Sequence, residues 1–248
     1  MIPVLNIGPE NGKIMITVTV PKIFQPFYCE DLIRLGKNND GGYLVNRQDV
    51  MNSKNILSLG IGEDWSFEKD FISFNDCKLS AYDNSLNQSR LFNNKALQDS
   101  YNKFFTGNKV HVEKNIGVGY NDVPFNIIAT DPDTFLKCDI EGAEYGILDD
   151  PIIHTKLFTG MVMEFHEINK PENYSSLINF ISKVDHKLLH VHVNNYFYYK
   201  TDNGCIPDIL DLSFTSSTNI SLAKDINMPN KLDMSNNPDG EEFRILFK

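Results

Sequence analysis

Short apolar runs alternate with longer segments of helical periodicity along most of the chain, and this alternation constrains the fold more than any other feature. Strands are predicted at residues 56–59, 78–82, 110–116, 135–140, 160–166 and 188–193. Helices are predicted at residues 65–74, 85–105 and 174–184, and from near Gly142 onward. Strands that alternate with helices are joined by crossover connections, which leave neighbouring strands parallel. The pattern therefore predicts an α/β fold with a largely parallel sheet and helices on its faces.

The two ends of the chain carry weaker strand signals outside this repeat. Residues 14–20 alternate β-branched side chains in a way that suits a strand. Residues 242–247 alternate weakly and are expected to be the last strand of the sheet, with an antiparallel direction left open, after a polar, loop-rich stretch at 213–237. We expect a single domain over 1–248, with 1–50 as an N-terminal appendage and 51–248 as the core.

The balance of charges disfavours a polyanionic partner. The 248 residues include 23 Lys and Arg against 33 Asp and Glu, for a formal net charge of −10. Nucleic-acid affinity depends on basic side chains that neutralise phosphates, so we expect a small-molecule substrate and no nucleic-acid partner. No apolar stretch approaches the roughly 20 residues of a membrane span, and the first residues lack the features of a secretory signal. We therefore expect a cytoplasmic protein without membrane contact.

The four cysteines are widely separated along the chain. They are Cys29, Cys77, Cys138 and Cys205, and no two form a Cys-x-x-Cys pair. This spacing argues against both a zinc site and a disulfide framework. We predict reduced and mostly buried thiols.

A glycine turn follows the predicted strand at 56–59. Gly60 and Gly62 allow a tight turn and a close approach of the backbone to a ligand. The dinucleotide fingerprint G-x-G-x-x-G is absent, because Trp65 stands at its third glycine. Asp83 ends the next strand, where a carboxylate can accept hydrogen bonds from ribose hydroxyls, although it could also simply open a turn. An acidic residue placed to bind ribose hydroxyls, without the pyrophosphate fingerprint, fits S-adenosylmethionine better than NAD.

Three segments carry a resemblance to a known family. Residues 136–145, LKCDIEGAEY, resemble the LKxDIEGAE signature of FkbM-like methyltransferases. Residues 34–43 and 59–68 resemble two further segments of a methyltransferase-like branch of that superfamily, and Asn84 departs from it where proline is frequent. The resemblance spans roughly residues 32 to 200. It implies a Rossmann-like class I methyltransferase fold with a mostly parallel seven-stranded sheet, S-adenosylmethionine as cofactor, and methylation of hydroxyls.

The resemblance also assigns roles to residues of these segments. It places Gly60, Gly62 and Asp83 along the cofactor, with Asp40 and Tyr43 near its amino-acid end. Asp139 and Glu141 would face the transferring methyl group and the acceptor. Carboxylates also stabilise the N-terminus of a helix, by about 0.3–1 kcal/mol, which is the alternative explanation for both. That alternative does not explain why Asp139 ends an apolar strand.

Histidines lie near the ends of two later strands. Glu164 and His166 share one face of a strand, and His190, His192 and Asn194 share a face of the next. A histidine near neutral pKa suits a general base that takes the proton of an acceptor hydroxyl. We therefore group His166 and His192 with the catalytic candidates, and Glu164, His190 and Asn194 with the substrate-binding candidates.

A divalent metal is a second interpretation of the same side chains, although it is not the favoured one. Asp139, His166 and His192 offer the carboxylate and imidazole ligands that such ions accept. A bound cation would lower the pKa of the acceptor hydroxyl.

These observations lead to one main functional hypothesis. We expect an S-adenosylmethionine-dependent O-methyltransferase that acts on a sugar or nucleotide-linked sugar in surface-polysaccharide synthesis, with the acceptor class implied by the resemblance alone. Two alternatives stay open. One is methylation of protein or RNA, which the acidic balance disfavours, and the other is a protein that binds the cofactor without catalysis.

Overall fold

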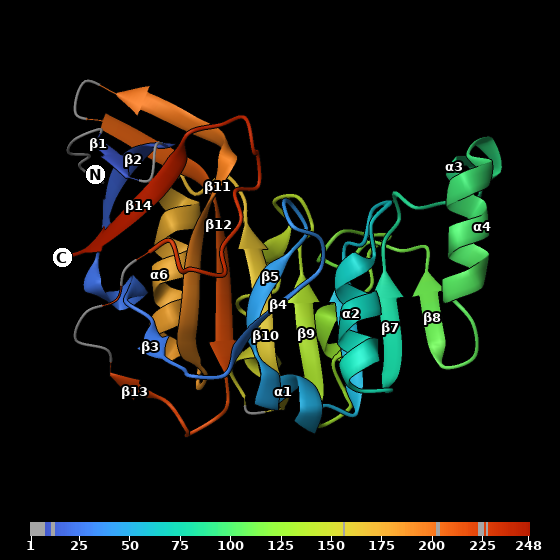
Figure 1. Ribbon diagram of the computed structural model, residues 1–248. Helices are drawn as coiled ribbons and strands as arrows, with labels where there is room; N and C mark the ends of the chain where they lie inside the picture. Colours follow the sequence, from blue (N-terminus) through green and yellow to red (C-terminus); the bar gives the residue numbers. More distant parts are fainter. Residues whose placement is uncertain (1–7, 11–12, 156, 202–203, 223–225, 227) are drawn as a thin grey trace.

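A seven-stranded sheet forms the centre of the molecule (Figure 1). This computed structural model describes residues 8–10, 13–155, 157–201, 204–222, 226 and 228–248. The strand order is β11-β12-β10-β9-β6-β7-β8. The strands are β6 (Asn55–Leu59), β7 (Lys78–Tyr82), β8 (Lys109–Val112), β9 (Thr134–Cys138), β10 (Phe158–Phe165), β11 (Lys187–Thr201) and β12 (Gly204–Thr215).

The sheet is mixed, with one strand reversed. β8, β7, β6, β9 and β10 pair in parallel, whereas β12 pairs antiparallel with both β10 and β11. The α/β class and the mostly parallel direction predicted from the sequence are therefore present, with β12 as the exception. The residues of β12 were not predicted as a strand, and residues 213–215 were assigned to a loop.

The C-terminal residues do not join the central sheet, contrary to expectation. They form β14 (Glu242–Phe247), which pairs in parallel with β2 (Lys13–Val20). β2 also pairs with β1 (Gly8–Glu10), so the two ends of the chain build a separate three-stranded sheet. In this position the alternating residues Phe243 and Ile245 of β14 are buried in the main apolar core.

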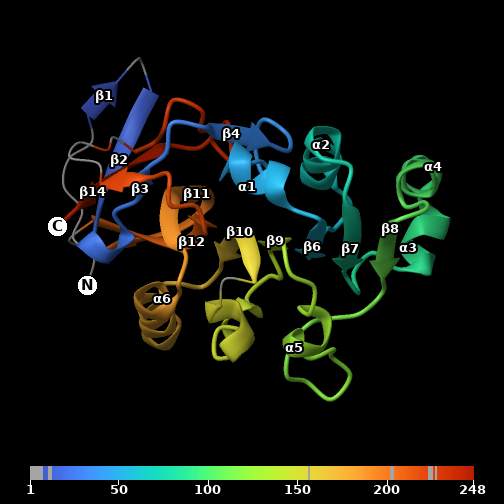
Figure 2. The same ribbon diagram turned by 90° about the horizontal axis from the view of Figure 1, so that it is seen from below.

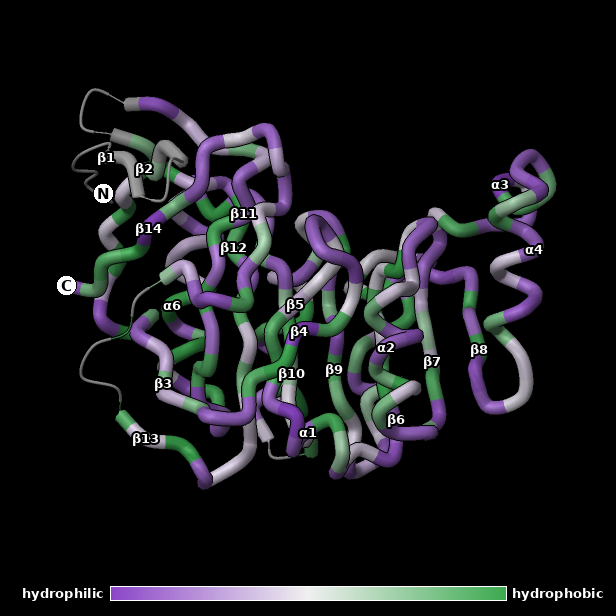
Figure 3. Tube along the Cα trace, in the orientation of Figure 1, coloured by the Kyte–Doolittle hydropathy of each residue, from purple (hydrophilic) through white to green (hydrophobic). Residues whose placement is uncertain are grey.

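Helices and turns cover both faces of the sheet (Figure 2). One face carries α1 (Arg47–Asn52) and α2 (Ser66–Phe74), and the other carries α5 (Phe125–Ile128) and α6 (Pro171–Lys183). α3 (Gln88–Asn93) and α4 (Lys95–Phe104) lie beyond β8 at the sheet edge. The middle strands are apolar (Figure 3), and every residue of β9 and β10 is buried, as expected for strands covered on both faces.

The prediction of a helix from near Gly142 onward is wrong. The segment contains two 3₁₀ turns, η2 (Glu144–Gly146) and η3 (Pro151–His154). Glu141 and Gly142 have φ of 57° and 100°, outside the helical region, and Pro151 lacks the N–H that would continue a helix.

The N-terminal segment packs onto the sheet. It contains η1 (Lys22–Phe24), β3 (Phe27–Tyr28) and an antiparallel hairpin of β4 (Leu32–Leu35) and β5 (Tyr43–Asn46), and β3 pairs with β13 (Ser221–Leu222). The Ser213 hydroxyl of β12 donates to the Leu44 carbonyl, which holds β5 against the sheet. Within the described part of the chain, no helix has both the length and the apolar character that a membrane crossing demands. All four cysteines are buried free thiols, as predicted.

Candidate active site

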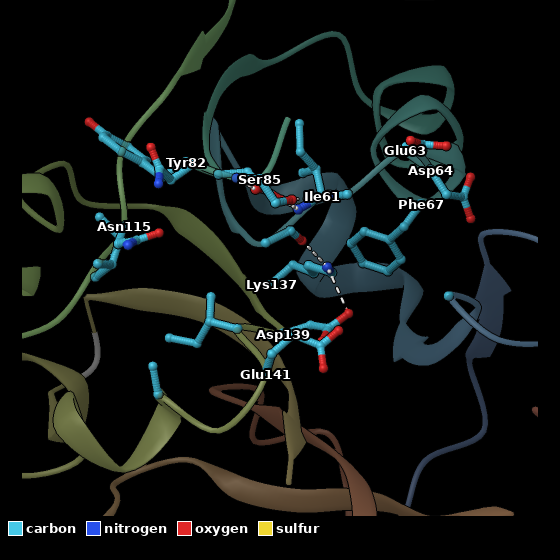
Figure 4. Close-up of a pocket in the computed structure, with 18 of the residues that line it drawn as sticks. Ile61, Glu63, Asp64, Phe67, Tyr82, Ser85, Asn115, Lys137, Asp139 and Glu141 are labelled. Atoms are coloured by element: carbon cyan, nitrogen blue, oxygen red, sulfur yellow. Dashed lines mark hydrogen bonds and ion pairs between the residues drawn. The ribbon is translucent and has the colours of Figure 1, made fainter. Parts of the chain in front are cut away.

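A cavity of about 470 Å³ opens at the carboxyl ends of β6, β7 and β9 (Figure 4). The chain leaves β6 toward β7 on one side and later returns to β9 on the other, so the cavity lies at a topological switch point of the sheet. Ligands of open α/β sheets bind at such points. Its lining includes eight acidic side chains and three lysines: Asp40, Glu63, Asp64, Glu68, Asp83, Asp122, Asp139, Glu141, Lys37, Lys114 and Lys137.

The glycine turn after β6 forms one wall of this cavity. Gly60 has φ of 74°, and a Cβ at this position would lie 1.6 Å from the Asp139 carbonyl oxygen, so only glycine fits against β9. Gly62 also has a positive φ, 49°, but a Cβ there would meet nothing within 4 Å. The first glycine therefore serves packing, and the second serves the backbone conformation of a wall that faces open space.

Asp83 holds the glycine turn from the end of β7. Its Oδ2 accepts hydrogen bonds from the backbone N–H groups of Ile61 and Gly62, at 2.8 and 2.7 Å. Its Oδ1 accepts from those of Ser85 and Leu86, at 2.6 and 3.2 Å. Burial alone would raise the pKa of Asp83, but these hydrogen bonds keep it below its usual value. The carboxylate thus lines the cavity with its acceptor positions already used by the backbone.

Lys137 connects the glycine turn to the end of β9, and sequence reasoning gave it no role. The buried ammonium of Lys137 donates to the Gly60 carbonyl and lies 3.3 Å from Asp139 Oδ2. Burial would lower its pKa, but the carboxylates of Asp139 and Glu68 raise it above the usual value. The sequence does carry an indication of this role, which is a lysine inside an otherwise apolar strand. A buried strand tolerates a charged side chain only where that side chain has partners.

The predicted residues at the carboxyl end of β9 both reach the cavity. Asp139 Oδ2 lies 3.2 Å from the Tyr43 hydroxyl oxygen, and Glu141 extends into solvent with its side chain 87% exposed. Tyr43, which was expected beside the cofactor, is instead buried behind Asp139, where its hydroxyl donates to Glu164 Oε2 at 2.8 Å.

Glu164 and His166 lie next to Asp139, at the end of β10. His166 Nδ1 donates to Glu144 Oε1 at 3.0 Å, and its Nε2 lies 3.6 Å from Glu164 Oε1. Burial would lower the pKa of His166, but Glu144 and the neighbouring carboxylates raise it to about 9. The imidazole therefore carries a proton at neutral pH, unlike the near-neutral base expected from sequence. We call Tyr43, Asp139, Glu144, Glu164 and His166 the strand-end cluster.

Two further predicted residues border this cluster. Asn194 donates to Glu164 Oε1 at 3.1 Å and lies 3.4 Å from Asp40 Oδ1. Asp40 lines the cavity and also accepts from the Asn236 amide at 3.1 Å.

His190 and His192 belong to a different buried group. His190 Nε2 lies 3.0 Å from Asp233 Oδ1, and the two nitrogens of His192 lie 3.4 Å from Asp211 and 3.6 Å from Glu242. Both histidines border a space of only about 10 Å³ beneath the β4–β5 hairpin and do not line the larger cavity. We call these five residues the buried histidine cluster. The structure thus brings Asp139, Glu141, Glu164 and His166 together and gives His190 and His192 other partners.

Comparisons with known proteins give only distant likenesses. No family model and no curated protein matches the chain. A solved precorrin-6y C5,15-methyltransferase from Geobacter metallireducens is 13% identical with a TM-score of 0.42, over 69% of this chain and 85% of that one. M. jannaschii TYW2 in complex with AdoMet is 10% identical with a TM-score of 0.40, over 86% and 99%. An rRNA methylase from Streptococcus thermophilus is 8% identical with a TM-score of 0.36, over 68% and 93%. Likenesses at this level assign neither reaction nor substrate to the chain.

Proposed function

We propose that the chain is an S-adenosylmethionine-dependent methyltransferase whose cofactor occupies the 470 Å³ cavity. The observation that carries this proposal is the charge of the cavity at the switch point of the sheet, where eight carboxylates face three lysines. A pyrophosphate such as that of NAD would be repelled there, and the third glycine of its fingerprint is missing. S-adenosylmethionine instead carries a sulfonium and an ammonium group, which this lining attracts.

The proposed orientation follows the lining of the cavity. The adenosine end lies near Asp83 and Ser85, and the amino-acid end lies toward Asp40 and Gly41. This direction places the methyl group near Asp139. In this arrangement Asp83 acts by fixing the Ile61 and Gly62 backbone beside the cofactor, because its own oxygens already accept four backbone hydrogen bonds.

We further propose that the acceptor is a hydroxyl of a small polyhydroxylated molecule, a sugar. The acceptor side offers two carboxylates that can accept hydrogen bonds from neighbouring hydroxyls, namely those of Asp139 and Glu141. The same negative lining disfavours the phosphates of RNA. Methyl transfer to such a hydroxyl needs alignment of oxygen, methyl carbon and sulfur, which binding in a fixed cavity supplies.

Calorimetry tests the cofactor part of the proposal. Wild-type protein is titrated with S-adenosylmethionine, S-adenosylhomocysteine and NAD, and we expect binding of the first two and none of the third. Binding of NAD alone would contradict the cofactor assignment.

The acceptor part is tested by transfer of a labelled methyl group. A panel of free sugars, nucleotide-linked sugars, bulk RNA and protein is offered, and we expect one added methyl group on the sugar fragment. Labelling of RNA or protein with every sugar unmodified would favour the macromolecular alternative. Cofactor binding without transfer to any class would favour a non-catalytic protein.

A further inference from the structure

Three potential metal ligands meet at the carboxyl ends of β9 and β10. One ligand atom each of Asp139, Glu164 and His166 lies within 4.8 Å of the others. Asp139 also lines the cavity, so the group lies at its border and not in a separate part of the molecule. Of the metal ligands considered from sequence, His192 is replaced here by Glu164.

Each of these three side chains is held at one atom by a neighbouring group. The Tyr43 hydroxyl donates to Glu164 Oε2 at 2.8 Å, and its oxygen lies 3.2 Å from Asp139 Oδ2. His166 Nδ1 donates to Glu144, a fully buried carboxylate that itself accepts from backbone N–H groups of the loop after β9. Metal-binding histidines are oriented in this way, by a carboxylate on the nitrogen that does not bind the metal.

The opposite nitrogen of His166 points into the group without a hydrogen bond. Only 9% of His166 is exposed, and its Nε2 lies 3.6 Å from Glu164 Oε1 and 3.5 Å from Glu141 Oε2. These distances are longer than good hydrogen bonds to carboxylates. The 3.6 Å between His166 and Glu164 is close to the separation of about 3.0–3.5 Å between two ligands of one cation bound at about 2.1 Å.

We propose that Asp139, Glu164 and His166 bind one divalent cation of the Mn²⁺ type, and that its open positions take oxygens of the methyl acceptor. Carboxylate and imidazole ligands together suit such a cation, which displaces the proton that His166 Nε2 otherwise carries. The second part of the proposal rests on the proposed methyltransferase function. A cation at this position lowers the pKa of the bound hydroxyl and fixes it beside the cofactor methyl group.

The transfer step then balances with residues already in place. The acceptor oxygen forms the new bond to the methyl carbon, and the carbon–sulfur bond breaks with its electron pair left on sulfur. The hydroxyl proton passes to the carboxylate of Glu141, which lines the cavity and reaches solvent.

Mn²⁺ titration followed by electron paramagnetic resonance tests the site without any turnover. The full chain is first stripped with a chelator. We expect one Mn²⁺ per wild-type chain, and a loss of affinity of about ten-fold or more in His166→Ala and in Glu164→Gln. Asp233→Asn, in the buried histidine cluster, is the matched control and should bind as the wild type does. Near-UV circular dichroism verifies the fold of each variant, and Asp139→Asn replaces any variant that fails to fold.

The result separates the cation proposal from the cofactor proposal. Absence of Mn²⁺ binding to the wild type, or binding that neither variant weakens, overturns the cation site. Calorimetry with S-adenosylmethionine on the same samples reports the cofactor independently. Mn²⁺ binding without cofactor binding would support the cation site and overturn the methyltransferase function, and the reverse result would overturn only the cation site.

Discussion

The strand-end cluster and the buried histidine cluster contain the same residue types, yet their surroundings differ. In the buried histidine cluster His190 lies within 3.0 Å of a carboxylate, His192 lies between two, and the adjoining space is about 10 Å³. In the strand-end cluster His166 Nε2 lies 3.5 and 3.6 Å from two carboxylates, much as His192 does, but Asp139 faces a cavity of about 470 Å³. Charged groups that face only one another contribute to the fold, whereas those that also border a cavity can bind a ligand.

The largest expected effect is on activity, from a change in the strand-end cluster. Asp139→Asn removes the charge that faces the methyl group in the proposed arrangement and keeps the shape of the side chain. We expect at least about a 100-fold loss of kcat, the range for removing a group that acts in proton transfer or its electrostatics, with cofactor affinity within a few-fold. Single-turnover kinetics at saturating cofactor measure it. A normal rate at saturation would place Asp139 outside the reaction.

The matching change in the buried histidine cluster should affect stability instead. Asp233→Asn removes the charge beside His190, and both side chains are at most 4% exposed. Weakening a buried hydrogen bond to a charged group costs about 1–3 kcal/mol, because the other group stays buried with a poorer partner. Urea unfolding should show a loss near the lower value, while the rate per folded molecule stays that of the wild type. Unchanged stability with lost activity would reverse the comparison.

The sheet was predictable from the sequence where strands are apolar, and the division of the polar residues into two clusters was not. β6, β9 and β10 are short, mostly apolar runs, so their burial is visible in the sequence. β12 alternates polar and apolar residues and follows directly after the long strand β11. This pattern indicates a strand less clearly than an apolar run does. The role of Tyr43 depends on Glu164, 121 positions away in the chain, and no local pattern encodes that contact. His166 and His192 could be distinguished only by their neighbours, because His166 lies beside Glu141 at the border of the larger cavity and His192 lies between Asp211 and Glu242.

A buried carboxylate outside both clusters, Asp49, extends the comparison because no cation accompanies it. Asp49 is 3% exposed, and burial raises its pKa from 3.8 to about 7. The folded state therefore holds a proton at Asp49 that the unfolded state loses above about pH 4, so the contribution of Asp49 to wild-type stability falls as pH rises from about 4 to about 7. Asp49→Asn cannot ionise and lacks this penalty. The unfolding free energy of the variant relative to wild type should increase by about 2 kcal/mol between pH 5 and pH 7.

Chemical denaturation at several pH values measures this difference. A constant difference between Asp49→Asn and the wild type across that range would show that Asp49 ionises normally in the folded state. It would also show that burial without a counter-charge has little effect on the carboxylates of this protein.

The smallest expected effect comes from the glycine turn, where a packed and an open position lie two residues apart. Gly60 contacts the backbone of Asp139, while Gly62 faces open space at the cavity. Gly62→Ala meets no steric obstacle and pays only for its positive φ, about 1 kcal/mol. We expect this small loss in urea unfolding, together with a weaker affinity for S-adenosylmethionine, because the added methyl group projects toward the bound cofactor. Gly60→Ala is the contrasting variant, and its larger loss of stability follows from the 1.6 Å approach to the Asp139 carbonyl. An unchanged cofactor affinity in a folded Gly62→Ala would mean that the cofactor does not contact this wall.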